Sequence, residues 1–223
     1  MSGLTDWRFI FNKWVLHQGR SPFYEKKVKK ELRHFRGDLF VDIGANQGLY
    51  SIALAKNFRR VYAFEPNPKM VHLLNDRLKQ RKISNVLVFA KALGDSIGRT
   101  TLYQDPHKGC GGSTDTILSV FRYNPHTIPE GGKSHVYIGK TGVEVDVSTY
   151  DNTVEVPADL VKIDVEGAEF KVLDGMQNSL KARKVKEIIV ELHDKTRREE
   201  LEKKLDGYLL KWIDDDHLRA SLT

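Results

Sequence analysis

Four side chains that can bind polar groups or exchange a proton stand at the ends of short apolar runs in this sequence. They are Asp42, Glu65, Asp164 and His193. In open α/β sheets, ligands bind outside the carboxyl ends of the strands, so we expect these side chains to meet at one sheet edge. Carboxylates there can accept hydrogen bonds from the hydroxyl groups of a ribose, and an imidazole titrates near neutral pH. The pattern predicts a nucleoside site with acid–base chemistry beside it.

A glycine-bearing turn at residues 44–48 follows the first of these apolar runs and leads into an apolar helical pattern. Glu65 comes 17 residues after Gly48, and an acidic residue about 20 residues past such a turn can hold a ribose. Asn46 stands where a dinucleotide fold has its second glycine, and Asp42 would repel a pyrophosphate but attract the amino group of a methionyl moiety. The turn therefore favours S-adenosylmethionine over NAD. The alternative is an ordinary strand–helix turn with acidic strand ends.

The acidic group Asp164, Glu166 and Glu169 is the first candidate for proton transfer. Carboxylates this close repel each other and raise at least one pKa, so one of them could act as a base. Alternatively, Glu169 only caps a helix or pairs with a neighbouring cation. Lys162 lies two residues before Asp164 and therefore on the same face of a strand. It can pair with a carboxylate or attract an anionic acceptor.

His193 is the second candidate base, although a lone histidine after a strand is as often structural. Other histidines are irregularly spaced and lack the short paired pattern of a zinc site. An oxygen-ligated magnesium ion near Asp164 has no support in the sequence. We therefore expect no metal.

Four segments resemble the signature blocks of the FkbM-type methyltransferases: residues 42–48, 63–68, 162–169 and 190–193. Together they span roughly residues 38–194. The resemblance implies a class I fold that uses S-adenosylmethionine and usually methylates a hydroxyl oxygen. From the positions at the strand ends, we expect Glu65 to hold the ribose, Asp42 to reach the methionyl amine directly or through water, and the adenine to rest after the third strand. The full set of expected cofactor contacts is Asp42, Gly44, Ala45, Asn46, Gly48, Tyr50, Ser51, Glu65, Pro66, Ala92, Leu93 and Asp164.

The elements that position these residues alternate between strand and helix. Strands are expected at residues 39–43, 61–65, 86–90, 160–164 and 187–192, followed by a hairpin at 208–213 and 217–222. This pattern predicts an α/β fold with a seven-stranded, mostly parallel sheet, a terminal antiparallel hairpin and helices on both faces. Asn67 and Pro68 should begin one helix, and Thr196 with Glu199 should form a capping box at another.

Two segments depart from the alternation. Residues 1–37 should form an N-terminal helical cap, with a basic helix at about 23–35, ahead of a catalytic domain at 38–223. Residues 104–135, rich in glycine and proline, form an insertion too long for a connecting turn. We expect this insertion to cover the active site and select the substrate. Disorder over part of it without ligand is an equal alternative.

Composition sets broader bounds. The chain has 223 residues, a net charge of +6 and one cysteine, which suits a single domain without an internal disulfide. No apolar stretch reaches the roughly 20 residues that span a bilayer. The N-terminus shows no basic segment leading into an apolar run, so we expect no secretory signal. We therefore expect a cytoplasmic protein without stable membrane insertion. The basic balance permits anionic partners, and the sequence carries no sign of oligomeric state.

The leading hypothesis is an S-adenosylmethionine-dependent O-methyltransferase acting on a hydroxyl of a small molecule or carbohydrate, possibly an anionic one. An RNA ribose 2′-O-methyltransferase is the first alternative, because the start of the chain is basic and Lys162 lies near Asp164. A non-catalytic cofactor-binding scaffold is the second.

Overall fold

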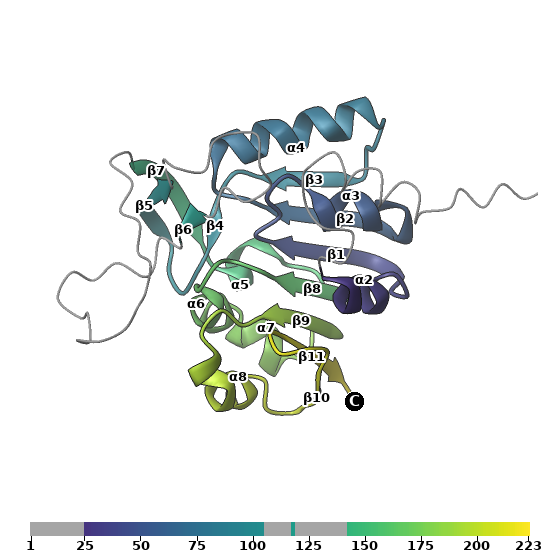
Figure 1. Ribbon diagram of the computed structural model, residues 1–223, viewed down its shortest axis with the longest axis vertical. Coiled ribbons are helices and arrows are strands. Elements are labelled where there is room, and N and C mark those ends of the chain that lie inside the picture. The colour runs from purple at the N-terminus through teal and green to yellow at the C-terminus, as the bar shows by residue number, and fades with distance from the viewer. Residues whose placement is uncertain (1–24, 105–116, 119–141) are drawn as a thin grey trace, which may run out of the picture.

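The computed structural model describes residues 25–104, 117–118 and 142–223, and its centre is a seven-stranded sheet (Figure 1). In spatial order the strands are β10 (Tyr208–Trp212), β11 (His217–Leu222), β9 (Glu187–Glu191), β8 (Leu160–Ile163), β1 (Gly37–Ile43), β2 (Phe58–Phe64) and β3 (Val86–Phe89). All neighbours from β9 to β3 pair in parallel, whereas β11 pairs antiparallel with both β9 and β10. This order confirms the predicted fold class, including its terminal hairpin.

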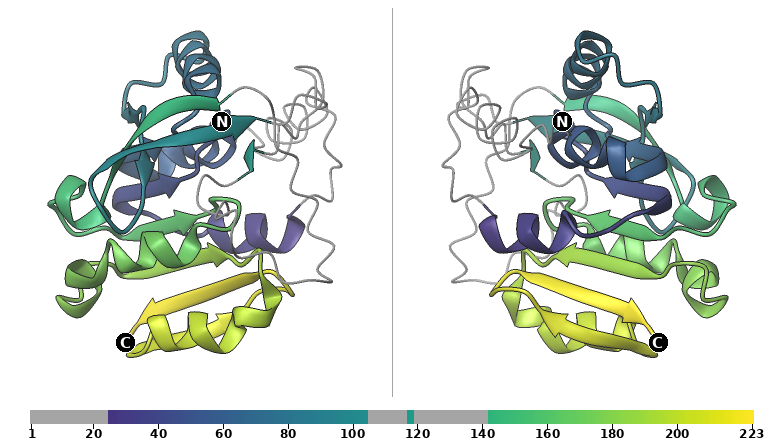
Figure 2. Two further views of the ribbon diagram at one scale, coloured as in Figure 1. Left: turned by 90° about the vertical axis from the view of Figure 1, so that its left-hand side faces the viewer. Right: turned by 90° about the vertical axis from the view of Figure 1, so that its right-hand side faces the viewer.

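Helices cover both faces of the sheet (Figure 2). One face packs against α2 (Lys26–Leu32), α3 (Leu49–Leu54) and α4 (Pro68–Gln80), and the other against α5 (Tyr150–Thr153), α6 (Glu169–Asp174), α7 (Gln177–Lys181) and α8 (Arg198–Lys204). Two short 3₁₀ turns, η1 (Ala55–Asn57) and η2 (Lys195–Arg197), complete the main layers. The central strands are continuous apolar runs because each is buried on both sides. In β1, Phe40 packs toward α2 and α3, while Leu39 and Val41 pack toward the opposite layer.

Of the two helix starts predicted from the sequence, one is confirmed and the other is wrong. The Asn67 side chain accepts a hydrogen bond from the backbone N–H of Lys69 at 2.9 Å, and Pro68 is the first residue of α4, as predicted. The capping box of Thr196 with Glu199 is wrong. Asp194 instead accepts hydrogen bonds from the N–H and hydroxyl of Thr196, at 3.2 and 2.7 Å. The chain therefore makes a 3₁₀ turn first, and α8 begins at Arg198.

A second, four-stranded sheet lies beside the third strand of the main sheet. Its order is β4 (Ala92–Leu93), β7 (Gly142–Ser148), β5 (Gly98–Gln104) and β6 (Ile117–Leu118). The strands β5 and β7 pair antiparallel, so the segments flanking the predicted insertion form one ribbon. Most of that insertion, and most of the predicted N-terminal cap, lie outside the described residues. Among the residues that are described, no helix has the length and apolarity to cross a membrane.

Candidate active site

The glycine turn after β1 is built from left-handed backbone conformations. Gly44, Asn46 and Gly48 have φ values of 82°, 50° and 84°, and asparagine is among the few non-glycine residues that tolerate this region. This explains why asparagine can replace the glycine that the dinucleotide pattern has at this point. A Cβ at Gly44 would lie 1.8 Å from the carbonyl oxygen of Asp164. The turn therefore needs glycine where β1 and β8 end side by side.

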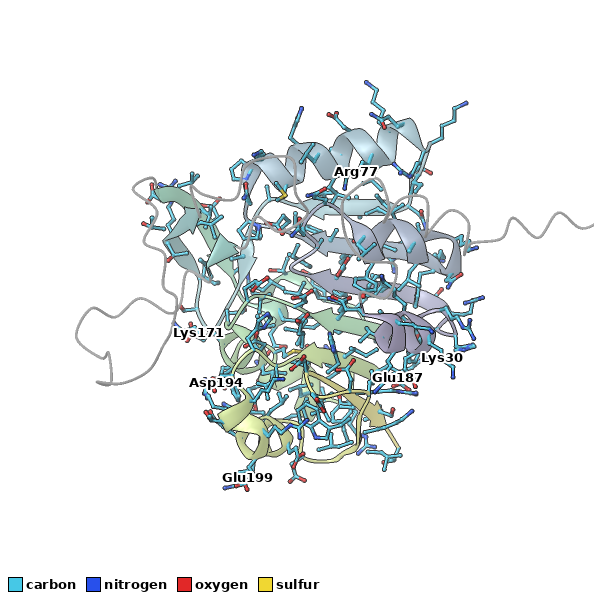
Figure 3. All side chains as sticks on the ribbon, in the orientation of Figure 1. Lys30, Arg77, Lys171, Glu187, Asp194 and Glu199 are labelled. Atoms are coloured by element: carbon cyan, nitrogen blue, oxygen red, sulfur yellow. The ribbon has the colours of Figure 1, made fainter. Side chains whose placement is uncertain are left out.

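Contacts from two neighbouring elements hold this turn in place. The backbone N–H groups of Gly44 and Ala45 both donate to the carbonyl of Phe64, at 3.0 Å each. The Arg77 guanidinium of α4 (Figure 3) donates to the carbonyl of Gln47 at 3.0 Å. These contacts fix the turn before any ligand is bound.

Asp42 is buried beneath the start of α3. Its Oδ2 atom accepts hydrogen bonds from the Ser51 backbone N–H at 3.0 Å and the Ser51 hydroxyl at 2.5 Å. Burial raises the pKa of Asp42, partly offset by the positive charge of Lys162. The other oxygen, Oδ1, has no hydrogen-bond partner among the described residues. Asp42 thus orients the first turn of α3, and only its Oδ1 has acceptor capacity left for a cofactor amine.

Glu65 lies directly after β2 and is only 3 % exposed. Its two carboxylate oxygens accept the backbone N–H groups of Asn46 and Asn67, each at 2.8 Å. Each oxygen retains a second acceptor position. A buried, fixed carboxylate that can accept two further hydrogen bonds fits a ribose diol. Burial raises the pKa of Glu65 to about 7, although the two N–H groups oppose the shift.

The remaining predicted cofactor contacts lie around this turn. Ala45 is buried in the core with Tyr50, and Pro66 is partly buried beside Glu65. Ala92 and Leu93 are both buried in β4, and Leu93 packs into the core with Phe64. Their contact with an adenine ring stays a prediction.

A row of charged side chains crosses the sheet on the face covered by α2 and α3. We call it the charged row: Asp42 on β1, Lys162 on β8, Glu191 on β9 and His217 on β11. Asp42 and Lys162 are register partners, as are Glu191 and His217. Lys162 pairs with Ile189, two residues before Glu191, so alternation places the four side chains on one face.

Lys162 is the most deeply buried cation of the charged row, at 1 % exposure. Its ammonium lies 2.7 Å from Asp164 Oδ2 and 4.6 Å from the centre of the Tyr50 ring. Burial raises the pKa of Asp164, but the charge of Lys162 outweighs this and the pKa falls to about 2. Asp164 is therefore ionised. The predicted pairing of Lys162 with a carboxylate is present in the structure.

His193 is surrounded by carboxylates. Its Nδ1 is 2.6 Å from Glu169 Oε1, and its Nε2 is 3.3 Å from Glu166 Oε2 and 3.7 Å from Glu191 Oε1. Burial lowers the pKa of His193, but the hydrogen bonds that its ring donates to Glu166 and Glu169 outweigh this and raise the pKa to about 11. The imidazole is therefore protonated at neutral pH. This corrects the expectation of a base that titrates near pH 7, because an imidazolium has no free lone pair to receive a proton.

Sequence reasoning missed part of this assembly. Glu191 was not among the predicted site residues, although it lies in the fourth signature block and fits the RNA methyltransferase alternative, and neither His217 nor Glu25 was a candidate. Glu25 stands just before α2, where its carboxylate comes near Glu191 and His217. The signal for His217 was the hairpin itself, since an antiparallel strand after β9 sets His217 opposite Glu191.

The strand order, the glycine turn and the acidic residue after β2 define a class I S-adenosylmethionine-dependent methyltransferase fold, with S-adenosylmethionine as the cofactor. The family model for the methyltransferase FkbM domain matches residues 42–219. The chain belongs to the FkbM methyltransferase family, which confirms the resemblance seen in its sequence.

Individual proteins add detail. The hexuronic acid methyltransferase AglP of Haloferax volcanii is 28% identical over 160 residues, which cover 70% of this chain and 56% of AglP. The chain thus spans about half the length of this curated relative. The crystal structure of methyltransferase FkbM from Methylobacillus flagellatus KT has a TM-score of 0.55 at 16% identity, covering 83% of this chain and 43% of that one. A putative rRNA-methylase from Clostridium thermocellum has a TM-score of 0.50 at 10% identity, covering 88% and 96%. The two structures share the fold.

Cofactor binding should depend on pH through Glu65. Its pKa is raised to about 7, so the carboxylate is ionised above pH 7 and protonated below it. The ionised form accepts more hydrogen bonds from a ribose. We expect the affinity for S-adenosylhomocysteine to increase roughly tenfold between pH 5.5 and 8.5, because most of the carboxylate changes state over that range. Calorimetry at four pH values measures this.

The variant Glu65→Gln should bind more weakly at pH 8.5 and show no such dependence, because its amide does not titrate. Glu200→Gln, which changes an exposed glutamate on α8, should retain the wild-type profile and serves as the matched control. A wild-type affinity that does not vary with pH would remove Glu65 as the ribose ligand.

Proposed function

We propose that this chain transfers the methyl group of S-adenosylmethionine to a hydroxyl oxygen of a carbohydrate or a similar polyhydroxylated small molecule. The observation that carries the proposal is the group of carboxylates at the ends of β8 and β9, namely Asp164, Glu166 and Glu191, arranged around Lys162 and His193. Carboxylates accept hydrogen bonds from the hydroxyl groups of sugars. The name of the relative AglP adds support, because a hexuronic acid is a polyhydroxylated acceptor.

Asp164 is the residue that we assign to the acceptor hydroxyl. The hydroxyl oxygen attacks the methyl carbon, the carbon–sulfur electron pair passes to sulfur, and the hydroxyl proton passes to the carboxylate. An oxygen that has just gained a methyl group is a strong acid, so even a carboxylate of low pKa can receive its proton. Positioning can contribute about 7–11 kcal/mol to such a step, more than a single base contributes. Lys162 fixes the Asp164 carboxylate in place.

We assign His193 a positioning role. Its imidazolium joins Glu166 in the turn after β8, Glu169 on α6 and Glu191 on β9. These contacts fix the residues around the proposed acceptor site. They do not involve the glycine turn after β1, where we expect the cofactor to bind. With Lys162, His193 also supplies positive charge for an anionic acceptor such as a hexuronic acid.

The variant His193→Gln tests this role. We expect it to bind S-adenosylhomocysteine with an affinity within about twofold of wild type. We expect kcat to fall by roughly 10–100-fold, whereas loss of a general base can lower a rate by up to about 10⁴-fold. Isothermal titration and steady-state rates measure the two effects. His72→Gln, on the exposed face of α4, is the matched control and should leave both values unchanged. An unchanged kcat in His193→Gln would remove His193 from the site.

Incubation with labelled S-adenosylmethionine and three acceptor pools tests the function itself. The pools contain hexuronic acids, neutral sugars and RNA. We expect label in one of the sugar pools. Mild alkali then distinguishes the products, since a methyl ether on a hydroxyl survives and a methyl ester on the hexuronic carboxylate is hydrolysed. Label in RNA, or binding of S-adenosylhomocysteine without transfer to any pool, would contradict the proposal.

A further inference from the structure

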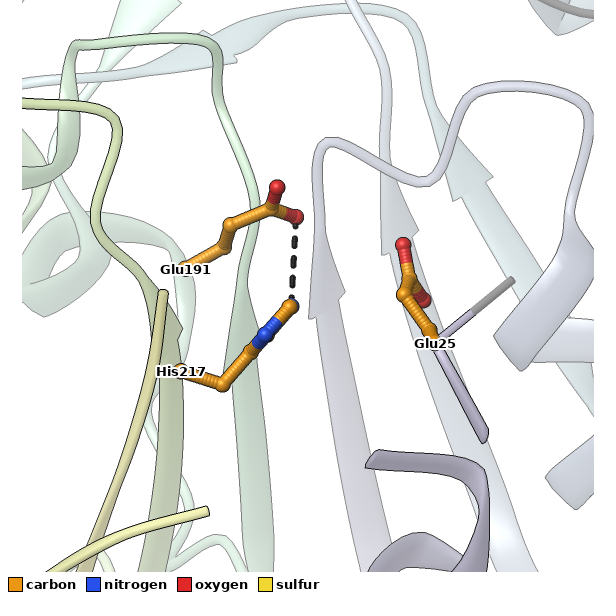
Figure 4. Close-up of side chains that lie close together, drawn as sticks. All are labelled: Glu25, Glu191 and His217. Atoms are coloured by element: carbon orange, nitrogen blue, oxygen red, sulfur yellow. Dashed lines mark ion pairs between the residues drawn. The ribbon is translucent and has the colours of Figure 1, made fainter. Parts of the chain in front are cut away.

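Three side chains from separate parts of the chain meet at one end of the charged row. They are Glu25, just before α2, Glu191 at the end of β9 and His217 at the start of β11 (Figure 4). One ligand atom from each lies within 4.8 Å of the other two. Nitrogen and carboxylate oxygen atoms at this separation can all reach one ion with modest side-chain movement.

Two atoms of this group lack hydrogen bonds. His217 is only 5 % exposed, and its Nε2 has no hydrogen-bond partner in the described part of the chain. The nearest carboxylate oxygen, Glu191 Oε2, is 3.4 Å away. Glu25 Oε2 is also buried without a hydrogen-bond partner among the described residues. A buried polar atom without a hydrogen bond is unfavourable, so both atoms favour a ligand that binds between them.

The orientation of His217 is that of a metal ligand. Its Nδ1 lies 2.7 Å from Asp214 Oδ1, which also accepts the backbone N–H of His217 at 2.9 Å. With Nδ1 held by Asp214, Nε2 is the nitrogen directed at Glu191, and a metal ion binding there would displace any proton that Nε2 carries. Histidines that bind metals almost always donate their other ring N–H to a carboxylate, a carbonyl or water in this way.

The irregular spacing of the histidines along the chain does not exclude this group, because its members are far apart in the sequence. The three residues come from the start of the described chain and from two antiparallel strands near its end. Their proximity depends on the register of β9 with β11 and on the position of α2.

We propose that Glu25, Glu191 and His217 bind one divalent first-row transition-metal ion. One imidazole and two carboxylates form a mixed donor set, which suits Mn²⁺ or Zn²⁺ better than Ca²⁺. Three protein ligands leave at least one position for water or an acceptor hydroxyl. The neighbouring Lys162 opposes a cation at this point, but its ammonium is paired with Asp164 at 2.7 Å. Metal binding at this site does not depend on the proposed methyl transfer, and it can be measured without any methyl acceptor.

The experiment uses the full chain after dialysis against a chelator and removal of the chelator. Mn²⁺ is titrated by electron paramagnetic resonance and Zn²⁺ by calorimetry, with Mg²⁺ as the comparator. We expect one equivalent of Mn²⁺ or Zn²⁺ to bind with a micromolar Kd and to raise Tm. His217→Gln and Glu25→Gln should each weaken binding by at least a hundredfold. Asp214→Asn should weaken it by about 10–100-fold, as loss of a group that orients a ligand does.

Two further variants separate this site from its alternatives. His193→Gln should retain binding, because the second possible group, Asp164, Glu191 and His193, shares only Glu191 with the proposed one. His72→Gln controls for surface histidines. Because His217 is buried, circular dichroism must show that its variant is folded, and Glu25→Gln provides the same test at a partly exposed position. Kd values above 1 mM for both metals, or wild-type affinity in both ligand variants, would overturn the proposal and leave a plain ion pair of His217 with Glu191.

Discussion

Asp164→Asn is expected to destabilise the protein by about 3 kcal/mol, the lower end of the cost of breaking a buried ion pair. The reason is Lys162, whose side chain is 2% exposed and would lose its partner at 2.7 Å. The lower end applies because the Asp164 side chain is itself 21% exposed and Glu191 remains nearby. The same change should lower the methyl-transfer rate by at least a hundredfold if Asp164 contacts the acceptor. Urea unfolding and steady-state kinetics measure the two losses.

A double-mutant cycle isolates the contribution of the Asp164–Lys162 ion pair to the free energy of unfolding. Lys162→Met alone should cost less than Asp164→Asn, and the double variant should recover at least 1 kcal/mol relative to the sum, because a neutral pair leaves no buried charge. Asp216→Asn is the matched control, since it removes the partner of an exposed lysine, Lys195, at 2.6 Å. That change should cost less than about 1 kcal/mol. Purely additive effects of the two single variants would show that the buried pair makes no special contribution.

Gly44→Ala is expected to be at least as severe, with a loss of about 3 kcal/mol or more in the free energy of unfolding. A left-handed backbone costs about 1–2 kcal/mol for a residue with a Cβ. The added carbon would also lie 1.8 Å from the backbone carbonyl oxygen of Asp164, so β1 and β8 would have to separate. Overpacking of this kind typically costs 1–3 kcal/mol. Because β1 leads directly into the glycine turn, where we expect the cofactor to bind, binding of S-adenosylhomocysteine should weaken as well.

Gly207→Ala isolates the backbone cost from the steric one. Gly207 has a φ of 86°, close to that of Gly44, but a Cβ there would meet no atom within 4 Å. We therefore expect Gly207→Ala to lose only about 1–2 kcal/mol and to bind cofactor normally. Equal losses in the two variants, measured by thermal unfolding, would show that the close approach of β1 to β8 is unimportant.

The sequence was sufficient for features that depend on local pattern. Buried parallel strands are apolar runs, so β1, β2, β8 and β9 were located to within a few residues. Residues at the ends of such strands converge by topology, which is why Glu65 and Asp164 were predicted correctly as neighbours of the glycine turn. Asn67 was predictable for the same reason, since a helix cap is a local signal.

Features that depend on contacts between distant elements were beyond the sequence. The protonation of His193 follows from carboxylates on a turn, a helix and a strand, and no spacing reveals that all three face one ring. Likewise, Glu25 and His217 are nearly two hundred residues apart, and only the packing of α2 over β9 and β11 brings them together. The error at Thr196 has a local cause, because Asp194 competes for the same N–H group.

The direction of β11 determines which of its two ends can be mutated or tagged without changing the proposed acceptor site. A parallel strand has its last residue at the sheet edge where ligands bind. The antiparallel strand β11 instead has its first residue, His217, at that edge, together with the bend at Asp214. Library mutagenesis of residues 213–217 would therefore alter the sheet edge at which the proposed acceptor site lies. Thr223 follows the far end of the same strand, at the opposite rim (Figure 1). A purification tag or surface tether attached there would lie at the sheet edge opposite to the proposed acceptor site.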